Sequence, residues 1–483
     1  MKLLQKRGDE VLLLCSPREE VSLGEYLSVS DGGGRALIVQ AYEQSYLEYP
    51  GMLEELVREE IVESLGQGEE RDPLEIRNFN QLLRDLKLVR CKVRGVLSGG
   101  RLSLEAGWLP SRSRALVRRV SMPELLRAQG VQSRRPLKLG EAQGEEHSIC
   151  WEDLDGKLTL ILGRKETGKS HLAKLLATGL VQAGAGVLVF DINNEYLALT
   201  KAEELEGRAQ ALTPSSSLLF SLQGLGLGVM VRIVEWALET PAISVREFAR
   251  LWRACEAEGR LTLDALLERA EQARMNEHVR EALVSRLLAL RGSRLFSEWP
   301  KPPELSSLFY REGGQLTVLA LRHLSRLQRR ILVEALLGKA LELLSLERIP
   351  PIFVLAEEAH LYLGETHWDD LITRMRHYGI FPIFVTNQPD AVPETVYRQL
   401  DNLFLFNVNS ERDVERISAC LGLDAQSTAA IAKGLPMGHC LIVGLASHGL
   451  PVVSRIRSLG AEAGGATRSF LAWQQKAIKQ STS

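Results

Sequence analysis

The chain is poor in cysteine, with six in 483 residues and no C-x-x-C pair. This spacing excludes a zinc ribbon and a dense disulfide scaffold. The N-terminus lacks the apolar segment of a secretory signal, and no apolar run reaches the roughly 18 residues that span a bilayer. The net charge of −2 gives no global signature of polyanion binding. We therefore expect a soluble, cytoplasmic protein with no membrane partner.

Apolar residues, by contrast, are plentiful. Hydrophobic residues make up 45% of the chain and charged residues 25%, which excludes disorder as the main state. At roughly 150 residues per domain, the length predicts about three domains.

Charge is unevenly placed along the chain. Residues 43–75 hold eleven acidic residues against two arginines, whereas residues 90–138 hold twelve basic residues against two glutamates. Such asymmetry can mark a surface that faces a polyanion. The alternative interpretation is two stretches that neutralise each other across a domain contact, or that are solvated faces. Because Trp108 is the single aromatic residue among the basic ones, we favour the second interpretation and leave DNA contact open.

The first part of the chain has the pattern of a small all-β domain. Residues 1–120 contain short apolar runs separated by turn signals such as Asp31-Gly32-Gly33-Gly34, which predicts a small β-barrel or sandwich. One helix is expected over 52–64. The proline- and glycine-containing segment 121–150 is predicted to be a linker, and 461–483 a C-terminal tail.

From Leu158 onward, apolar strands alternate with helical patterns, which predicts an α/β domain with a parallel sheet over 151–460. Between about 242 and 300 the spacing is helical throughout, which predicts an inserted helical subdomain. The expected strands are 158–162, 187–190, 316–320, 352–355, 383–385 and 403–406.

The strongest motif is a complete G-x4-G-K-[ST] that follows the first of these strands and opens a helix. This context is typical of a loop whose backbone N–H groups bind nucleotide phosphates, so we expect ATP and Mg²⁺ as cofactors. Lys169, expected to face solvent, would bridge phosphate oxygens, and the Ser170 hydroxyl would ligate Mg²⁺. The predicted binding residues are Gly163, Arg164, Lys165, Glu166, Thr167, Gly168, Lys169, Ser170 and His171.

A second group of polar residues follows two later strands. The strand 352–355 runs into Glu357 and Glu358, for which we predict a metal-holding role and a water-activating role respectively. The alternative is a helix N-terminus that favours acids through its dipole. The strand 383–385 ends before Gln388, which we predict to orient water; the alternative is a strand-end cap.

The order of these motifs resembles that of the HerA/FtsK branch of P-loop DNA-translocating ATPases, and the HerA-like members most closely. The resemblance covers about 160–460. Five blocks carry it: GRKETGKS at 163–170, DINNEY at 191–196, EEAH at 357–360, RHYG at 376–379 leading into TNQP at 386–389, and LPMGHC at 435–440. The chain departs from the family pattern at Met375 and His377, and by an extra Asn387 before Gln388.

The resemblance implies a RecA-like P-loop ATPase core preceded by a small β-barrel, whose characteristic turn would be Val21–Tyr26. It also implies a homo-hexameric ring around DNA, double-stranded in the typical case. A nuclease partner, typically of the NurA type, would act with the ring in DNA end processing or in defence against phage.

In such a ring, each nucleotide lies at a subunit boundary, and a neighbour can supply an arginine. Arg376, on a helical pattern over 369–378, is our predicted arginine finger. Arg374 is its rival, and a surface ion pair with Asp369 or Asp370 is the alternative for either arginine.

Three other functions fit parts of the pattern. The first is an ATP-controlled ring scaffold that activates a bound effector without moving DNA. The second is a conjugation-type pump ATPase that handles protein. The third, a small-molecule kinase, fits least well, because such enzymes are usually shorter and lack the acid-Glu-Ala-His block.

Overall fold

The computed structural model describes residues 1–48, 85–103, 107–130, 135–297, 304–363, 377–408, 410–421 and 424–459. The chain divides into two compact units. Unit 1 comprises Met1–Ile149 with Asn407–Ile456, and unit 2 comprises Cys150–Phe406 with Arg457–Ser483. Because 407–456 groups with the N-terminal part, this division differs from the predicted ATPase domain at 151–460. The helix expected over 52–64 and the tail 461–483 lie outside the described residues.

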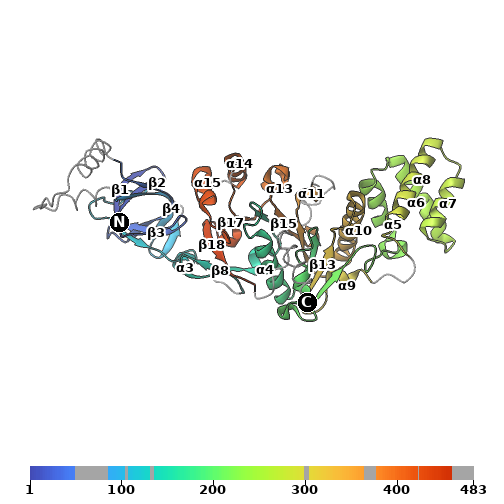
Figure 1. The fold of residues 1–483 in the computed structure, drawn as a ribbon, viewed down its shortest axis with the longest axis horizontal. Helices are drawn as coiled ribbons and strands as arrows, with labels where there is room; N and C mark the ends of the chain where they lie inside the picture. The colour runs from blue at the N-terminus through green and yellow to red at the C-terminus, as the bar shows by residue number, and fades with distance from the viewer. Residues whose placement is uncertain are drawn as a thin grey trace, which may run out of the picture. The chain divides into compact units, whose positions relative to one another are not determined.

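An antiparallel sheet of seven strands forms the N-terminal part of unit 1 (Figure 1). Its strand order is β1-β2-β5-β4-β3-β7, with β6 paired to β5, and β1 also contacts β7, so the sheet curls into a half-barrel. The strands are β1 (Lys2–Arg7), β2 (Glu10–Cys15), β3 (Tyr26–Ser30), β4 (Arg35–Tyr46), β5 (Lys87–Ser98), β6 (Arg101–Ser103) and β7 (Leu116–Arg119).

Alternating apolar residues build the core of this sheet. In β2, every second side chain is buried, as expected for a strand with one face against a core. The other strands of the sheet add buried aliphatic residues to the same core, among them Leu27, Val29, Leu37, Val39 and Val89. This sheet is compatible with the predicted all-β N-terminal part, although the apolar runs of the sequence do not reveal β1, β3 or β7.

The turn over Val21–Tyr26 packs against β18 (Val452–Ile456) within unit 1. Gly24 has a φ of +85°, and a Cβ there would lie 2.3 Å from Cγ2 of Val453, so only glycine fits. The Tyr26 hydroxyl donates to the Pro451 carbonyl oxygen at 2.9 Å, and Gln40 Nε2 donates to the same oxygen at 2.7 Å. The turn therefore joins the N-terminal sheet to the C-terminal strands of its unit.

The segment predicted as a linker, 121–150, contains helix α3 (Met122–Ala128) and strands β8 (Pro136–Ala142) and β9 (Glu145–Cys150). Strand β18 pairs antiparallel with β8 on one side and with β17 (His439–Gly444) on the other. Helices α14 (Glu411–Leu421) and α15 (Ala425–Gly434) precede β17. His147 in β9 is buried beside Ser454, with Nδ1 and Oγ 3.1 Å apart, and burial lowers its pKa from 6.5 to about 4.

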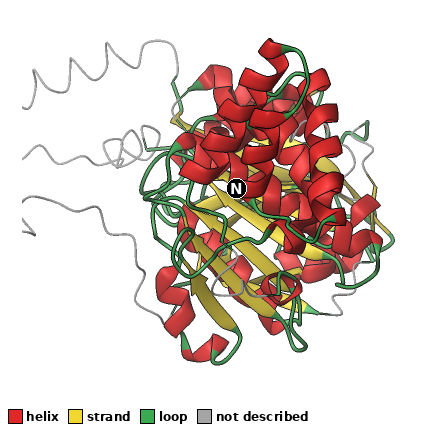
Figure 2. Ribbon diagram, turned by 90° about the vertical axis from the view of Figure 1, so that its right-hand side faces the viewer, coloured by secondary structure: helices red, strands yellow, loops and turns green. Residues whose placement is uncertain are grey.

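Unit 2 is built on a parallel sheet with the order β12-β13-β11-β14-β15-β10-β16, and helices pack around its strands (Figure 2). Its strands are β10 (Thr159–Leu162), β11 (Gly186–Asp191), β12 (Ala209–Leu212), β13 (Gln315–Ala320), β14 (Ile352–Glu357), β15 (Ile380–Thr386) and β16 (Asn402–Leu405). All residues of β14 are buried, as expected for a strand between two parallel neighbours. Each of the six strands predicted for this region is present.

The helices of unit 2 include long elements beside the sheet and a run between β12 and β13. Helix α4 follows β10, and α10 begins with a capping box in which Ser325 and Gln328 exchange hydrogen bonds. Helices α6, α7 and α8 fall in the range of the predicted insertion and pack against one another (Figure 1). The helices are α4 (Lys169–Gln182), α5 (Leu222–Arg232), α6 (Ala242–Ala257), α7 (Leu263–Gln272), α8 (Glu277–Gly292), α9 (Ser306–Phe309), α10 (Arg326–Ser345), α11 (His360–Leu363) and α13 (Glu394–Arg398).

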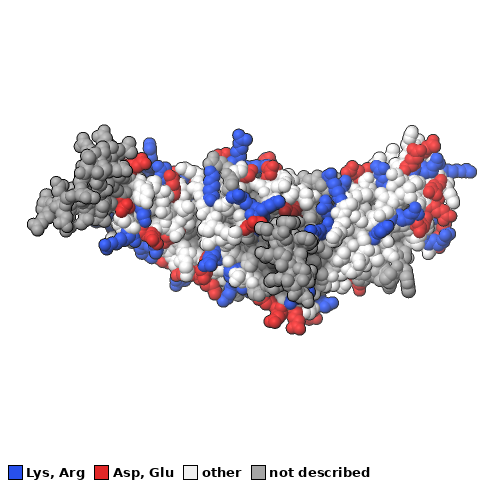
Figure 3. All heavy atoms as spheres, viewed as in Figure 1, with Lys and Arg blue, Asp and Glu red and all other residues white. Residues whose placement is uncertain are grey.

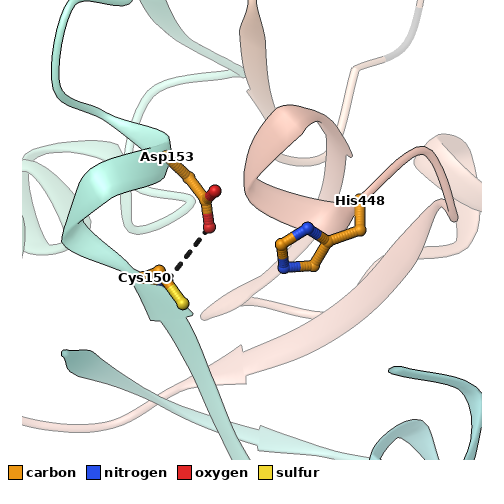
Figure 4. A group of neighbouring side chains, drawn as sticks. All are labelled: Cys150, Asp153 and His448. Carbon is orange, nitrogen blue, oxygen red and sulfur yellow. Dashed lines mark hydrogen bonds between the residues drawn. The ribbon is translucent and has the colours of Figure 1, made fainter. Parts of the chain in front are cut away.

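A 3-10 helix, Trp151–Asp153, begins unit 2 ahead of β10. The backbone N–H of Cys150 donates to the Asp153 carboxylate at 3.2 Å, which caps this short helix (Figure 4). Among the described residues, no helix is long and apolar enough to cross a membrane.

Candidate functional site

The G-x4-G-K-[ST] segment forms the loop between β10 and α4, as its sequence context predicts. Gly168 caps the helix with a φ of +115°, and Glu166 within the loop also has a positive φ of 64°. The Thr167 hydroxyl donates to the Arg164 carbonyl at 2.8 Å, which closes the loop on itself. The loop therefore leads into the N-terminus of a 14-residue helix, the arrangement that binds phosphate.

Gly163 lies close to the end of the neighbouring strand β16. Its φ is +152°, and a Cβ there would lie 2.5 Å from the Cβ of Phe406, the residue after β16. The backbone N–H of Phe406 donates to the Leu162 carbonyl at 2.8 Å, which fixes this approach. The first glycine of the motif is thus required by packing as well as by turn geometry.

Lys169 is buried, with 8% of its surface exposed, so the expectation of a solvent-facing loop lysine is wrong. Its ammonium donates to the carbonyl of Arg164, a residue of the same loop, at 2.5 Å. Burial lowers the pKa of Lys169, while the charges of Glu357, Glu358 and Glu195 oppose that shift. The loop curls back over the N-terminus of α4, so the side chain of Lys169 points into the loop.

The two predicted metal-holding groups come together in the structure. The Ser170 hydroxyl donates to Oε1 of Glu357 at 3.3 Å. Ser170 follows β10 and Glu357 ends β14, and β15 lies between these two parallel strands. A hydroxyl and a carboxylate are oxygen donors of the kind that Mg²⁺ takes together with phosphates and water. The residues present therefore fit a magnesium ion beside a bound phosphate.

Glu357 is deeply buried, with 4% of its surface exposed. Burial raises its pKa to about 7, and the charges of Glu195, Glu358 and Asp191 act in the same direction. A hydrogen bond from Tyr196 opposes the shift. A cation bound beside a buried carboxyl such as this one stabilises the charged form and thereby lowers the pKa.

Glu358 has an unusual backbone conformation for a residue that is not glycine, with a φ of +51°. A left-handed backbone conformation costs free energy for a residue other than glycine, and such residues cluster at functional sites. Among the described residues, its Oε2 atom accepts no hydrogen bond, although Nδ1 of His360 lies 3.5 Å away. An available carboxylate oxygen is what a general base requires.

The residues after β15 lie between the loop strand β10 and the Glu357 strand β14. The Thr386 hydroxyl contacts Nδ1 of His360 at 3.0 Å and accepts the backbone N–H of Gln388 at 3.1 Å. The side chain of Gln388 is exposed at this sheet edge. This arrangement is compatible with the predicted role of Gln388, which stays a prediction.

His171, also predicted to bind the nucleotide, makes a different contact in the structure. Nε2 of His171 lies 2.8 Å from the backbone oxygen of Arg457, so its ring is occupied by a contact within unit 2. Arg376, the predicted arginine finger, and its rival Arg374 lie outside the described residues.

Tyr196 is a site residue to which the sequence analysis gives no role. Its hydroxyl donates to Oε2 of Glu357 at 2.5 Å, and both side chains are buried. The sequence offers one indication of such a role: Tyr196 follows closely after an apolar strand that ends at Asp191. What the local pattern does not reveal is that β11 pairs directly with β14.

Several members of the basic stretch 90–138 are paired within unit 1. The ion pairs are Arg90–Glu43, Lys92 with Asp9 and Asp424, Arg118–Glu124, Arg119–Glu25 and Lys138–Glu146. On the face in Figure 3, basic and acidic side chains are interspersed instead of gathered by sign. These contacts favour internal neutralisation for the residues concerned.

Comparison with known proteins agrees with this site. Residues 156–340 match the family model of the helicase HerA central domain. The fold is similar to that of VirB4 of Thermoanaerobacter pseudethanolicus, with 15% identity, a TM-score of 0.53, and coverage of 68% of this chain and 98% of that chain. No curated protein matches the sequence.

A second similar structure is the bacterial conjugative coupling protein TrwBdeltaN70 in an unbound monoclinic form. It has 15% identity, a TM-score of 0.52, and coverage of 73% of this chain and 94% of that chain. These likenesses establish a mixed α/β fold of the RecA-like P-loop type. With the match of residues 156–340 to the HerA central domain and the loop geometry described above, they support a HerA/FtsK-like P-loop ATPase.

Proposed function

We propose that unit 2 binds Mg-ATP at the β10–α4 loop and hydrolyses it to drive movement along DNA. The observation that carries the proposal is the 3.3 Å contact between Ser170 and Glu357, with Glu358 next in the chain. This contact joins the phosphate-binding loop to Glu357, and Glu358 follows it in the chain, so a phosphate-binding loop, a metal-holding pair and a candidate base belong to one site.

The roles of the residues follow from their positions. The backbone N–H groups of the loop and the Lys169 ammonium would hold the phosphates, and Lys169 would exchange its contact with the Arg164 carbonyl for a phosphate oxygen. Ser170 and Glu357 would hold Mg²⁺, which supplies charge neutralisation at the phosphates. Glu358 would accept a proton from the attacking water through its available Oε2 atom.

We further propose that the chain acts as a homo-hexameric DNA translocase or helicase with a nuclease partner. The match to the HerA helicase central domain supports the DNA-handling role. In such a ring, Arg376 would act on the nucleotide of the neighbouring subunit, and Gln388 would orient the attacking water.

The experiment measures ATP turnover by the full chain with and without duplex DNA, after native mass measurement under the same conditions. A hexamer whose ATPase rate rises with duplex DNA supports the motor. A hexamer whose rate does not respond to single- or double-stranded DNA would contradict the translocase and favour the ATP-controlled scaffold.

A further inference from the structure

The Glu357 carboxylate is held on both of its oxygens by groups from different strands. Ser170 after β10 donates to Oε1 at 3.3 Å, and Tyr196 after β11 donates to Oε2 at 2.5 Å. The Tyr196 side chain is fully buried and Glu357 nearly so. The rotation of this carboxylate is therefore set by two hydrogen bonds, of which the one from Tyr196 is shorter.

Tyr196 is itself held in place by the strand end that it follows. The Asp191 carboxylate accepts the backbone N–H of Glu195 on Oδ1 at 2.9 Å and that of Tyr196 on Oδ2 at 2.8 Å. The ammonium of Lys174 in α4 lies 5.6 Å from the centre of the tyrosine ring, within range of a cation–π contact. The turn over 191–196 thus presents the hydroxyl to Glu357 in one orientation.

We propose that Tyr196 is a positioning residue of the nucleotide site, which aims Oε1 of Glu357 at Ser170 and thereby at the Mg²⁺ of bound Mg-ATP. This inference rests on the proposed function, because it assigns to the same site a residue that orients Glu357. When Mg²⁺ binds, Ser170 would turn its hydroxyl to the metal, and Tyr196 would remain as the group that keeps the carboxylate in place.

The physical reason lies in burial. Without the tyrosine hydroxyl, Oε2 would be a buried carboxylate oxygen without its donor, which is costly, and the carboxylate would rotate to find another partner. Groups that orient a metal-binding residue in this way change metal affinity by about 10–100-fold when they are removed.

The test is Tyr196→Phe in the full chain, with binding of a fluorescent ATP analogue as the readout in place of turnover. We expect affinity in EDTA to stay within about twofold of wild type, because the loop itself is unchanged. The Mg²⁺ concentration that gives half of the metal-dependent gain in affinity should rise by about 10-fold or more.

Tyr397→Phe is the matched control. Tyr397 is also a buried tyrosine of unit 2, and its hydroxyl donates to the Pro389 carbonyl at 2.8 Å. We expect it to lower the melting temperature as any lost buried hydrogen bond does, while leaving the Mg²⁺ dependence unchanged.

A double-mutant cycle with Glu357→Gln shows whether Tyr196 acts through Glu357. In the glutamine background, removal of the Tyr196 hydroxyl should cause no further change in Mg²⁺ dependence. If Tyr196→Phe does not fold, Asp191→Asn keeps the hydroxyl but weakens the turn, and a smaller rise in the required Mg²⁺ is expected.

The outcomes separate the two proposals. If wild type binds no ATP analogue in either condition, the proposed function fails, and this inference fails with it. If wild type binds with a clear Mg²⁺ dependence that Tyr196→Phe and Asp191→Asn leave unchanged, the positioning role is overturned and the proposed function stands.

Discussion

The hydroxyl of Ser170 lies 3.3 Å from Oε1 of Glu357, although 187 residues separate them in the chain. The contact exists because β10 and β14 run parallel, with only β15 between them, so their carboxyl ends meet at one edge of the sheet. Sites of open α/β sheets form at this edge. Several predictions about the neighbouring residues depend on this geometry.

Replacing Glu358 by glutamine should leave ATP binding intact and reduce turnover roughly 10²-fold or more, because the residue would no longer accept a proton. Steady-state phosphate release and analogue binding measure the two effects. Glu347→Gln is the control, since Glu347 also has a positive φ, of 54°, but is exposed at the end of α10. Turnover close to wild type in Glu358→Gln would assign the base role elsewhere.

Alanine at Gly163 should distort the phosphate-binding loop. Its Cβ would have to displace Phe406, and the positive φ adds strain of about 1–3 kcal/mol. We expect ATP affinity to fall at least about tenfold and the melting temperature to drop. In Gly156→Ala only the strain applies, because a Cβ there meets nothing within 4 Å at a φ of +71°. Equal effects of the two substitutions on ATP affinity would argue against a packing role for Gly163.

His147 gives unit 1 a defined pH dependence. Burial lowers its pKa from 6.5 to about 4, so the unfolded chain takes up a proton at higher pH than the folded protein does. Its contribution to the free energy of unfolding is therefore complete above pH 6.5 and is lost as the pH falls from 6.5 to 4. Urea unfolding across this range should show a smaller loss of stability in His147→Gln than in wild type. Parallel pH profiles would mean that His147 does not supply this dependence.

Arg376 is predicted to act in trans. Arg376→Ala subunits should bind ATP but hydrolyse it poorly, since an arginine finger contributes about 10³–10⁵ in rate. Mixing them with Glu358→Gln subunits should restore some turnover, because an intact Arg376 then faces an intact Glu358 at some boundaries. Native mass measurement of the mixture is the control that shows whether the subunits exchange. Exchanged rings without any recovery of turnover would rule out the trans role.

The sequence predicts six of the seven parallel strands of unit 2 because these six are short apolar runs, as in 352–355 and 383–385. It misses β12, whose sequence AQAL is not such a run. It predicts the loop at Gly163–Ser170 because the G-x4-G-K-[ST] motif lies within eight consecutive residues. Lys169 is different: its burial depends on how the whole loop curls, which residue spacing does not encode.

Long-range pairing accounts for the remaining differences. The role of Tyr196 depends on β11 lying next to β14, and the grouping of 407–456 with the N-terminal part depends on β18 pairing with β8. Neither strand pairing can be inferred from the hydropathy pattern of the residues involved. The prolines and glycines of 121–150 predict a linker, so the sequence does not reveal the β-strands of this segment. Pro136 in fact begins β8, the position in a strand where a proline is tolerated.

The central claim is that the β10–α4 loop and the carboxylates of β14 form a working ATP site. The most direct test is Mg-ATP binding and phosphate release by wild type and Lys169→Ala, with Lys201→Ala, at an exposed position of the same unit, as control. We predict that wild type and Lys201→Ala bind and hydrolyse ATP, and that Lys169→Ala loses binding or turnover while still folding. Undiminished ATP turnover in Lys169→Ala would contradict the account.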